Sequence, residues 1–223
     1  MKVCTDACLF GAWAAADPLI QSAKNILDIG SGTGLLSLIL AQQSSATITA
    51  VEIESGAFNQ TKANFNLSPW KERLDVVHAS IQEYVAIKNG ELFDCIITNP
   101  PFFEGDLNSP DIAKNLASHS TALSWDDLAN SVATLLQENG KWYVLVPTLR
   151  AYTMQKIASN YGLYLTEECL MYNDAKHLPI RAMLKFVKEK DTVIQRNKFI
   201  IKNADQSYTD EFTALLKAYY LHL

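Results

Sequence analysis

Apolar and polar positions along the chain predict strands and helices in alternation. Short apolar runs rich in Ile, Val and Leu are typical of buried strands, and the stretches between them have helical spacing. The strands are predicted over residues 25–29, 47–53, 74–79, 93–98 and 141–147. The helices between them are predicted over residues 34–43, 55–66 and 125–138. Ser55 is expected to cap the second helix, and Asn139-Gly140 is expected to end the third.

The two ends of the chain have a different pattern. A helix is predicted over residues 9–22, with Pro18 dividing it. After a helix over 149–161, the apolar runs 163–172 and 180–187 have no helix between them, so we expect them to pair antiparallel. A last helix is predicted from Asp205 to Leu223, with these residues facing the core: Tyr208, Phe212, Leu215, Leu216 and Tyr219.

Strands that alternate with helices require crossovers, which favour a parallel sheet covered on both faces. We therefore predict a doubly wound, Rossmann-like α/β sheet, mostly parallel, with an antiparallel strand at the C-terminal edge. The 223 residues are 48% hydrophobic, enough for one large core. We expect a single domain over 1–223, with a helical segment at 1–24 before the core and a C-terminal helix at 204–223.

Charge and cysteine content narrow the possible partners. The formal net charge is −5, so no global basic field attracts nucleic acid, although a local patch can still hold phosphates. The stretch 185–202 is rich in Lys and Arg, and either a phosphate-binding patch or a solvated edge strand and loop explains it. The four cysteines form no Cys-x-x-Cys pair, and no apolar run reaches membrane-spanning length. We expect a cytoplasmic monomer with free thiols, no metal and no membrane association.

A glycine-rich loop follows the first predicted strand, at residues 28–34, where open α/β sheets bind ligands. Gly30, Gly32 and Gly34 allow a ligand to approach the backbone. The third small residue of a dinucleotide fingerprint would fall at Leu35, so the spacing does not fit a nicotinamide cofactor. It fits S-adenosylmethionine, whose ammonium and sulfonium suit the carboxylate of Asp28.

Two further acidic positions lie at the end of the second predicted strand and just after it. Glu52 stands where a carboxylate can accept both ribose hydroxyl hydrogens of the cofactor. Glu54 is the alternative, because a shift along a strand changes which side chains face the ligand.

Asn99-Pro100-Pro101-Phe102 leaves the fourth predicted strand. The prolines have no N–H, so carbonyls remain free to accept hydrogen bonds. Asn99 through its side-chain oxygen and Pro100 through its carbonyl can accept from both hydrogens of an exocyclic amine, and Phe102 offers a face for a base. Phe103 widens that face or fills the core. Alternatively, the two prolines only make the chain rigid where it leaves the strand, without a role in catalysis. The glycine loop upstream argues against this alternative.

These motifs resemble class I S-adenosylmethionine-dependent methyltransferases over about residues 25–187. The resemblance implies an acidic residue near the adenine at the end of the third strand, where this chain has Ser80. The tetrapeptide is similar to that of enzymes that methylate adenine N6, guanine N2 or a glutamine amide nitrogen.

The first thirteen residues, Asn-Pro-Pro-Phe-Phe and the segment 208–221 resemble the bacterial tRNA1(Val) adenine-N6 methyltransferases. That resemblance implies that Thr5 and Asp6 lie against the methionine part of the cofactor, and that tRNA is the partner. His119 either touches the substrate or caps the following helix. The family's leading segment has no counterpart before Met1, and Ser118 stands where the family tends to have Arg, so we expect weaker RNA binding.

The leading hypothesis is therefore methylation of N6 of the adenosine 3′ of the anticodon in tRNA. Guanine-N2 methylation of rRNA and glutamine-N5 methylation of a protein use the same chemistry and stay open. A cofactor-binding subunit without catalysis is a hypothesis of another class, and the intact tetrapeptide argues against it.

Overall fold

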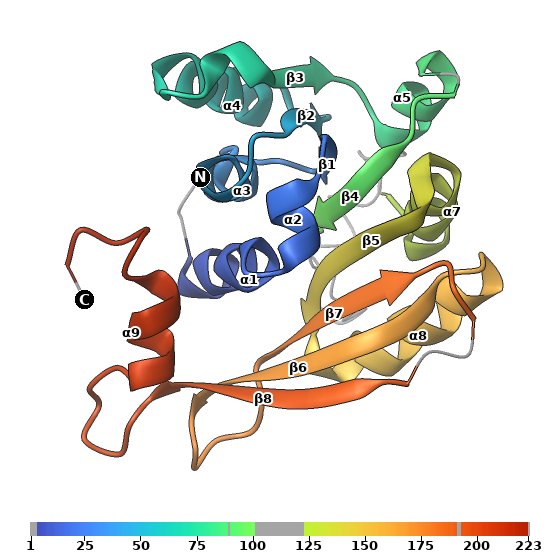
Figure 1. Cartoon of the computed structure of the whole chain (residues 1–223). Coiled ribbons are helices and arrows are strands. Elements are labelled where there is room, and N and C mark those ends of the chain that lie inside the picture. The colour runs from blue at the N-terminus through green and yellow to red at the C-terminus, as the bar shows by residue number, and fades with distance from the viewer. Residues whose placement is uncertain (1–3, 89, 101–122, 191–192, 223) are drawn as a thin grey trace, which may run out of the picture.

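The computed structural model describes residues 4–88, 90–100, 123–190 and 193–222, and its strands form one sheet in the order β3-β2-β1-β4-β5-β7-β6-β8 (Figure 1). Their bounds are β1 Asn25–Ile29, β2 Thr47–Glu52, β3 Leu74–His78, β4 Phe93–Thr98, β5 Leu136–Pro147, β6 Tyr164–Asp174, β7 Arg181–Val187 and β8 Gln195–Lys202. Strands β1 to β5 pair parallel, β7 is antiparallel to β5 and β6, and β8 is parallel to β6. The predicted mostly parallel sheet, with its antiparallel strand toward the C-terminal edge, is confirmed.

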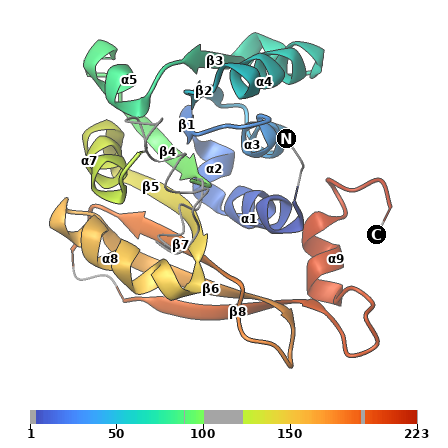
Figure 2. The same cartoon turned by 180° about the vertical axis from the view of Figure 1, so that it is seen from behind.

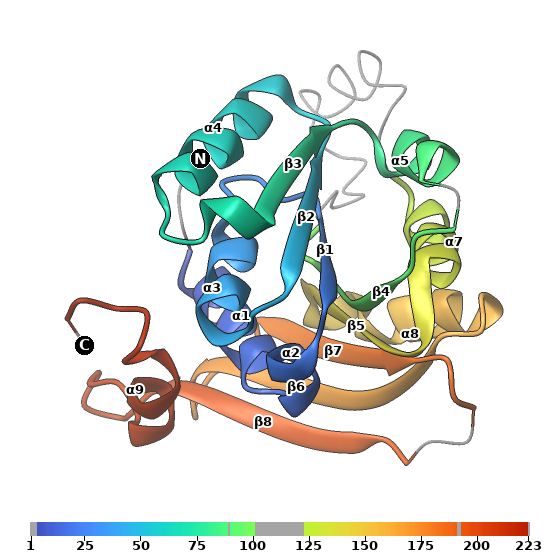
Figure 3. The ribbon, with the colours of Figure 1, turned by 45° about the horizontal axis from the view of Figure 1, so that its top comes forward.

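Helices cover both faces of this sheet (Figures 2 and 3). Their bounds are α1 Thr5–Ala15, α2 Pro18–Ser22, α3 Leu35–Gln43, α4 Ser55–Leu67, α5 Ile81–Ile87, α7 Trp125–Leu135, α8 Ala151–Asn160 and α9 Asp210–Leu216. Helices α1 to α4 and α9 pack on one face, and α5, α7 and α8 pack on the other, each against its own buried cluster. The doubly wound arrangement is thus the observed one.

The strand order creates a switch point between β1 and β4. The chain moves outward from β1 through β2 to β3, then returns to the other side of β1 as β4. The connections after β1 and β4 therefore diverge at the carboxyl edge of the sheet, which leaves room for a ligand there. The glycine loop and Asn99 are the segments that leave these two strands.

Two helix boundaries differ from the sequence-based prediction. Glu54, not Ser55, caps α4, because its carboxylate accepts hydrogen bonds from the N–H groups of Gly56 and Ala57 at 2.9 and 2.6 Å. Helix α7 ends at Leu135, and Gly140 lies inside β5 at an irregular register. A Cβ at Gly140 would lie 3.0 Å from the Asp94 carbonyl oxygen, so glycine allows a close strand approach there rather than a helix stop.

The terminal helices also differ in extent. Helix α1 begins at Thr5 rather than Leu9, and it packs on α3 where a Cβ at Gly11 would lie 2.9 Å from Ile39 Cδ1. The final helix is only α9, capped by Thr209. Residues before it form a turn instead, in which Gln206 has φ 71°. Tyr208, predicted to face the core, is 39% exposed and stacks on Phe212.

The basic stretch 185–202 is partly neutralised by ion pairs. Lys185 pairs with Asp17 and with Glu167, and Arg196 donates to Glu168 at 3.2 Å. Strand β8 within this stretch has one hydrogen-bonded neighbour, β6, so the solvated edge strand of the sequence analysis is what is observed.

Asp17 lies at the centre of a buried charge cluster between α1 and the sheet. Its side chain is 6% exposed and accepts hydrogen bonds from Lys141 Nζ at 2.8 Å and Lys185 Nζ at 2.9 Å. It also caps α2 by accepting from the Leu19 N–H. Burial alone would raise the pKa of Asp17, but the hydrogen bonds from the two lysines outweigh it and hold the pKa well below its usual range.

Replacing Asp17 with alanine is expected to lower the free energy of unfolding by about 2 kcal/mol at pH 7, because Lys141 and Lys185 lose a partner and α2 loses its N-cap, while Lys185 keeps Glu167. Urea unfolding measures this, with exposed Asp75→Ala as the matched control. Because the folded pKa of Asp17 is depressed, its contribution is complete above about pH 4 and is lost as the pH falls below that value. Equal midpoints for the two variants at pH 7 would contradict the prediction.

The cysteines are free, as predicted, and Cys8, Cys95 and Cys169 are buried while Cys4 is exposed. Burial raises the pKa of Cys169 to about 12, so its thiol stays protonated. Within the described ranges, no helix is long and apolar enough to cross a membrane.

Candidate active site at the carboxyl edge of the sheet

The glycine loop turns sharply at the end of β1. Gly30, Gly32 and Gly34 have φ of 74°, 59° and 77°, a left-handed backbone that side chains other than glycine rarely adopt. The Gly30 N–H donates to the Val51 carbonyl at 2.8 Å, which anchors the loop to β2. A Cβ at Gly30 would meet nothing within 4 Å, so open space lies beside this residue. The loop has the conformation that lets a ligand approach the backbone.

Helix α4 holds the glycine loop from the outside. Thr61 Oγ1 donates to the Gly32 carbonyl at 2.9 Å, and Asn64 Nδ2 donates to the Thr33 carbonyl at 2.8 Å. A Cβ at Gly34 would lie 2.7 Å from the Phe65 ring, so the loop and the helix are in close contact. These positioning residues were not among those predicted from the sequence. Asn64 and Phe65 follow Thr61 by three and four residues, so the sequence already indicates that the three side chains share one face of α4.

Asp28 lies under this loop and is fully buried. Its Oδ2 accepts hydrogen bonds from Ser37, at 2.7 Å from the hydroxyl and 3.1 Å from the N–H. Its Oδ1 has no hydrogen-bond partner among the described residues. Burial raises the pKa of Asp28 to about 6, although the bonds from Ser37 lower it. A buried carboxylate with an unused oxygen fits a cationic ligand group.

Glu52 joins the glycine loop to the turn after β2. Its Oε2 accepts from the Gly32 N–H at 2.8 Å, and its Oε1 accepts from the Glu54 N–H at 2.9 Å. The side chain is 7% exposed, and a carboxylate with two accepted bonds retains capacity for two hydroxyl hydrogens. Glu54 is exposed and is occupied by the cap of α4, so the geometry favours Glu52 as the ribose ligand.

Ser80 begins α5, a helix that the sequence analysis missed. Its hydroxyl donates to Glu83 Oε2 at 2.8 Å and accepts from the Glu83 N–H at 3.2 Å. The sequence contains the pattern of this capping box, Ser-x-x-Glu followed by an apolar residue, which predicts a helix start at this point. The Ser80 side chain is therefore engaged within its own helix terminus, and a contact with the cofactor adenine stays a prediction.

Asn99 follows β4 directly beside the glycine loop. The β1–β4 register places Ile29 opposite Thr98, and Thr98 Oγ1 donates to the Ile29 carbonyl at 2.8 Å. Asn99 Oδ1 is buried and accepts no hydrogen bond from the described residues. Pro100 is buried as well. A buried amide oxygen without a donor, at the switch point, is available to a ligand N–H.

Thr5 and Asp6 form the start of α1. Asp6 Oδ2 accepts from Arg181 Nε at 3.2 Å, which ties the helix to the carboxyl edge at β7. Thr5 contacts the Tyr220 hydroxyl near Cys8. The structure thus brings the glycine loop, Glu52 and Asn99 to one edge. Four predicted site residues, Pro101, Phe102, Phe103 and His119, lie outside the described residues.

Among the described residues, no group of three His, Cys, Asp or Glu side chains could hold a metal ion. The polar groups that reach the carboxyl edge are instead carboxylates, an amide oxygen and loop N–H groups. That donor and acceptor set suits an organic ligand with cationic and hydroxyl groups.

Comparison with known proteins agrees with this geometry. The family model of the methyltransferase small domain matches residues 14–158. The chain is 40% identical to a protein named tRNA1(Val) (adenine(37)-N6)-methyltransferase from Cytophaga hutchinsonii, covering 100% of this chain and 92% of the relative. A protein of the same name from Dyadobacter fermentans is 37% identical, covering 99% of this chain and 91% of the relative.

Among solved structures, a predicted O-methyltransferase from Agrobacterium tumefaciens superimposes with a TM-score of 0.74 at 15% identity, covering 98% of each chain. That similarity concerns the fold alone. The full-length sequence matches are more specific. The chain therefore belongs to the S-adenosylmethionine-dependent methyltransferases of the methyltransferase small domain family and, within them, to the tRNA1(Val) (adenine(37)-N6)-methyltransferase family.

Proposed function

We propose that this chain methylates N6 of an adenosine in tRNA, the adenosine 3′ of the anticodon, with S-adenosylmethionine as methyl donor. The observation that carries the proposal is the unpartnered, buried Asn99 Oδ1 beside the glycine loop. The names of the full-length relatives support the choice of tRNA. A tRNA substrate supports a cytoplasmic location for the reaction.

The residues at this edge fit the cofactor. Asp28 Oδ1 is an orphaned buried oxygen that would accept from the ammonium group, and Glu52 would accept from the ribose hydroxyls. The space beside Gly30 would admit the ligand next to the loop backbone. When bound, S-adenosylmethionine supplies an electrophilic methyl group on a sulfonium and leaves as S-adenosylhomocysteine.

In methyl transfer from a sulfonium, the protein contributes mainly the positioning of the reactants and electrostatic stabilisation of the transition state. The lone pair of an adenine N6 is delocalised into the ring. Asn99 Oδ1 and the Pro100 carbonyl would accept from its two hydrogens, which orients the amine and favours the localised lone pair. No strong base is needed, because the amine loses its proton after the nitrogen–carbon bond has formed.

The titration of Asp28 is expected to make the affinity for S-adenosylmethionine depend on pH. Because its pKa is raised to about 6 by burial, Asp28 becomes negatively charged as the pH rises through that value. Affinity for S-adenosylmethionine is therefore expected to increase between about pH 5 and pH 7, since only the carboxylate attracts the ammonium group. Calorimetric titration measures this, and the Asp28→Asn variant should have weaker, pH-independent affinity. A flat profile for the wild type would contradict the assigned role of Asp28.

A competition assay tests the substrate class. Tritiated S-adenosylmethionine is incubated with the enzyme and equal amounts of unmodified total tRNA, unmodified rRNA and a peptide release factor. Label is expected in tRNA. Label in rRNA alone would favour the guanine-N2 alternative, and label in the protein alone would favour the glutamine-N5 alternative. Cofactor binding without label in any of them would favour a non-catalytic subunit.

A further inference from the structure

Two loops extend the carboxyl edge of the sheet beyond Asn99. Residues 148–152 follow β5 and begin α8, and residues 175–180 connect β6 to β7. Thr148 Oγ1 donates to the Pro179 carbonyl at 3.1 Å, so the loops lie side by side. We call residues 148–152 and 175–180 the rim.

The rim carries cations that have no acidic partner in the part of the chain that the structure describes. Arg150 and Lys176 are exposed, and neither forms an ion pair within the described residues. The carboxylate nearest in sequence to Lys176, Asp174, is buried and bonds His177 Nδ1 at 2.7 Å. The rim is thus locally basic on a chain whose net charge is −5. Arg196 on β8, in contrast, is paired with Glu168.

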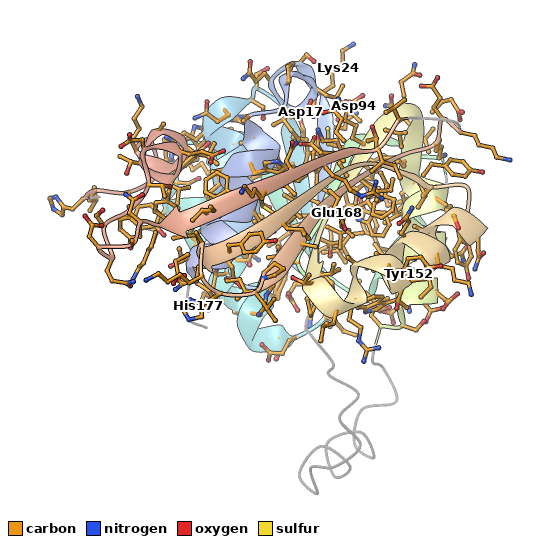
Figure 4. The ribbon with its side chains drawn as sticks, turned by 90° about the horizontal axis from the view of Figure 1, so that it is seen from below. Asp17, Lys24, Asp94, Tyr152, Glu168 and His177 are labelled. Carbon is orange, nitrogen blue, oxygen red and sulfur yellow. The ribbon has the colours of Figure 1, made fainter. Side chains whose placement is uncertain are left out.

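Large apolar side chains accompany these cations. Tyr152 is 77% exposed, and Leu149 and Leu178 are 94% and 86% exposed. Tyr152 lies two residues after Arg150 in the chain. An exposed aromatic ring on a surface with cations suits single-stranded RNA, because the ring can stack on a base while the cations contact phosphates. Figure 4 shows Tyr152 and His177 on the side of the molecule away from Asp17, Lys24 and Asp94.

The rim lies within reach of a nucleotide bound at Asn99. Thr98 is opposite Val144, and Val144 is four residues before Thr148 along β5. At about 3.3 Å per residue, this is roughly 13 Å, the length of about four stacked nucleotides. A strand of RNA that presents one base at Asn99 is therefore long enough to reach the rim.

We infer that the rim binds the RNA strand flanking the target adenosine, with Arg150 and Lys176 contacting phosphates and Tyr152 stacking on an unpaired base. This inference rests on the proposed function for the identity of the substrate. The surface itself is assigned from charge, exposure and position.

The test is the double charge reversal Arg150→Glu/Lys176→Glu, measured by fluorescence anisotropy with unmodified tRNA over a range of salt concentrations. The dissociation constant is expected to rise at least about tenfold, and the log–log salt slope to decrease by about 1.4, since each single-strand phosphate contact contributes about 0.7. The affinity for S-adenosylmethionine should not change. Tyr152→Ala is expected to weaken tRNA binding about tenfold, whereas Tyr152→Phe retains it.

The matched control is Lys24→Glu/Lys71→Glu, which changes the net charge equally at residues that precede β1 and β3, at the opposite edge. Equal weakening in both double variants, or loss of cofactor affinity in the rim variant, would overturn the inference. A wild type that binds tRNA through the rim but transfers no methyl to it would contradict the proposed function and leave the inference supported.

Discussion

Replacing Asn99 with alanine is expected to lower the rate of methyl transfer by about 10²–10³-fold, the loss seen when one preorganised hydrogen-bonding group is removed from an active site. Asn99 Oδ1 is buried, without a partner among the described residues, and lies beside the cofactor loop. In the proposed reaction this oxygen interacts with the amine most strongly in the transition state. The change should therefore appear in kcat rather than in the affinity for S-adenosylmethionine.

Single-turnover kinetics and calorimetric cofactor titration separate these two effects. Asn99→Gln keeps the amide but displaces its oxygen, so we expect its rate to lie between the wild type and Asn99→Ala. A thermal melt of each variant serves as the control for folding. If Asn99→Ala lost cofactor affinity in proportion to its rate, Asn99 would support the loop and not the chemistry.

Replacing Glu52 with alanine is expected to weaken binding of S-adenosylmethionine at least about 100-fold, the consequence of losing two charge-assisted hydrogen bonds of about 1.5 kcal/mol each. Part of this loss comes from the glycine loop, because the Gly32 N–H donates to Glu52 Oε2. Calorimetric titration of the cofactor measures the affinity.

Glu54→Ala is the matched control for Glu52→Ala. Glu54 caps α4 through the N–H groups of Gly56 and Ala57. Its loss should reduce helix stability modestly, as the loss of an N-cap does, and leave cofactor affinity near that of the wild type. The reverse outcome, weak affinity in Glu54→Ala and normal affinity in Glu52→Ala, would assign the ribose contact to Glu54.

Much of this site was predictable from local sequence. The apolar run before Asp28 and the glycines after it specify a strand, a left-handed turn and a helix, and φ is positive at all three glycines. Asn99 was placed correctly because the apolar run of residues 93–98 ends immediately before it. The strand, the glycine turn and the position of Asn99 depend on patterns over a few neighbouring residues, and such patterns are visible in a single sequence.

The positioning contacts were not predictable in the same way. Thr61 and Asn64 hold the glycine loop from about thirty residues away in the chain, and the approach of α4 that allows this depends on Phe65 packing against Gly34. Asp28 was expected to suit the cationic groups of the cofactor, and its Oδ1 has no partner among the described residues. It is buried beneath the loop and bound to Ser37, an environment that a single sequence does not specify.

The most direct measurement of the central claim is nucleoside mass spectrometry of tRNA1(Val) transcript after reaction with the enzyme and S-adenosylmethionine. A second transcript carries guanosine in place of the adenosine 3′ of the anticodon. We predict N6-methyladenosine in the first transcript and no methylated nucleoside in the second. Methylguanosine in either transcript, or N6-methyladenosine in both, would contradict the account.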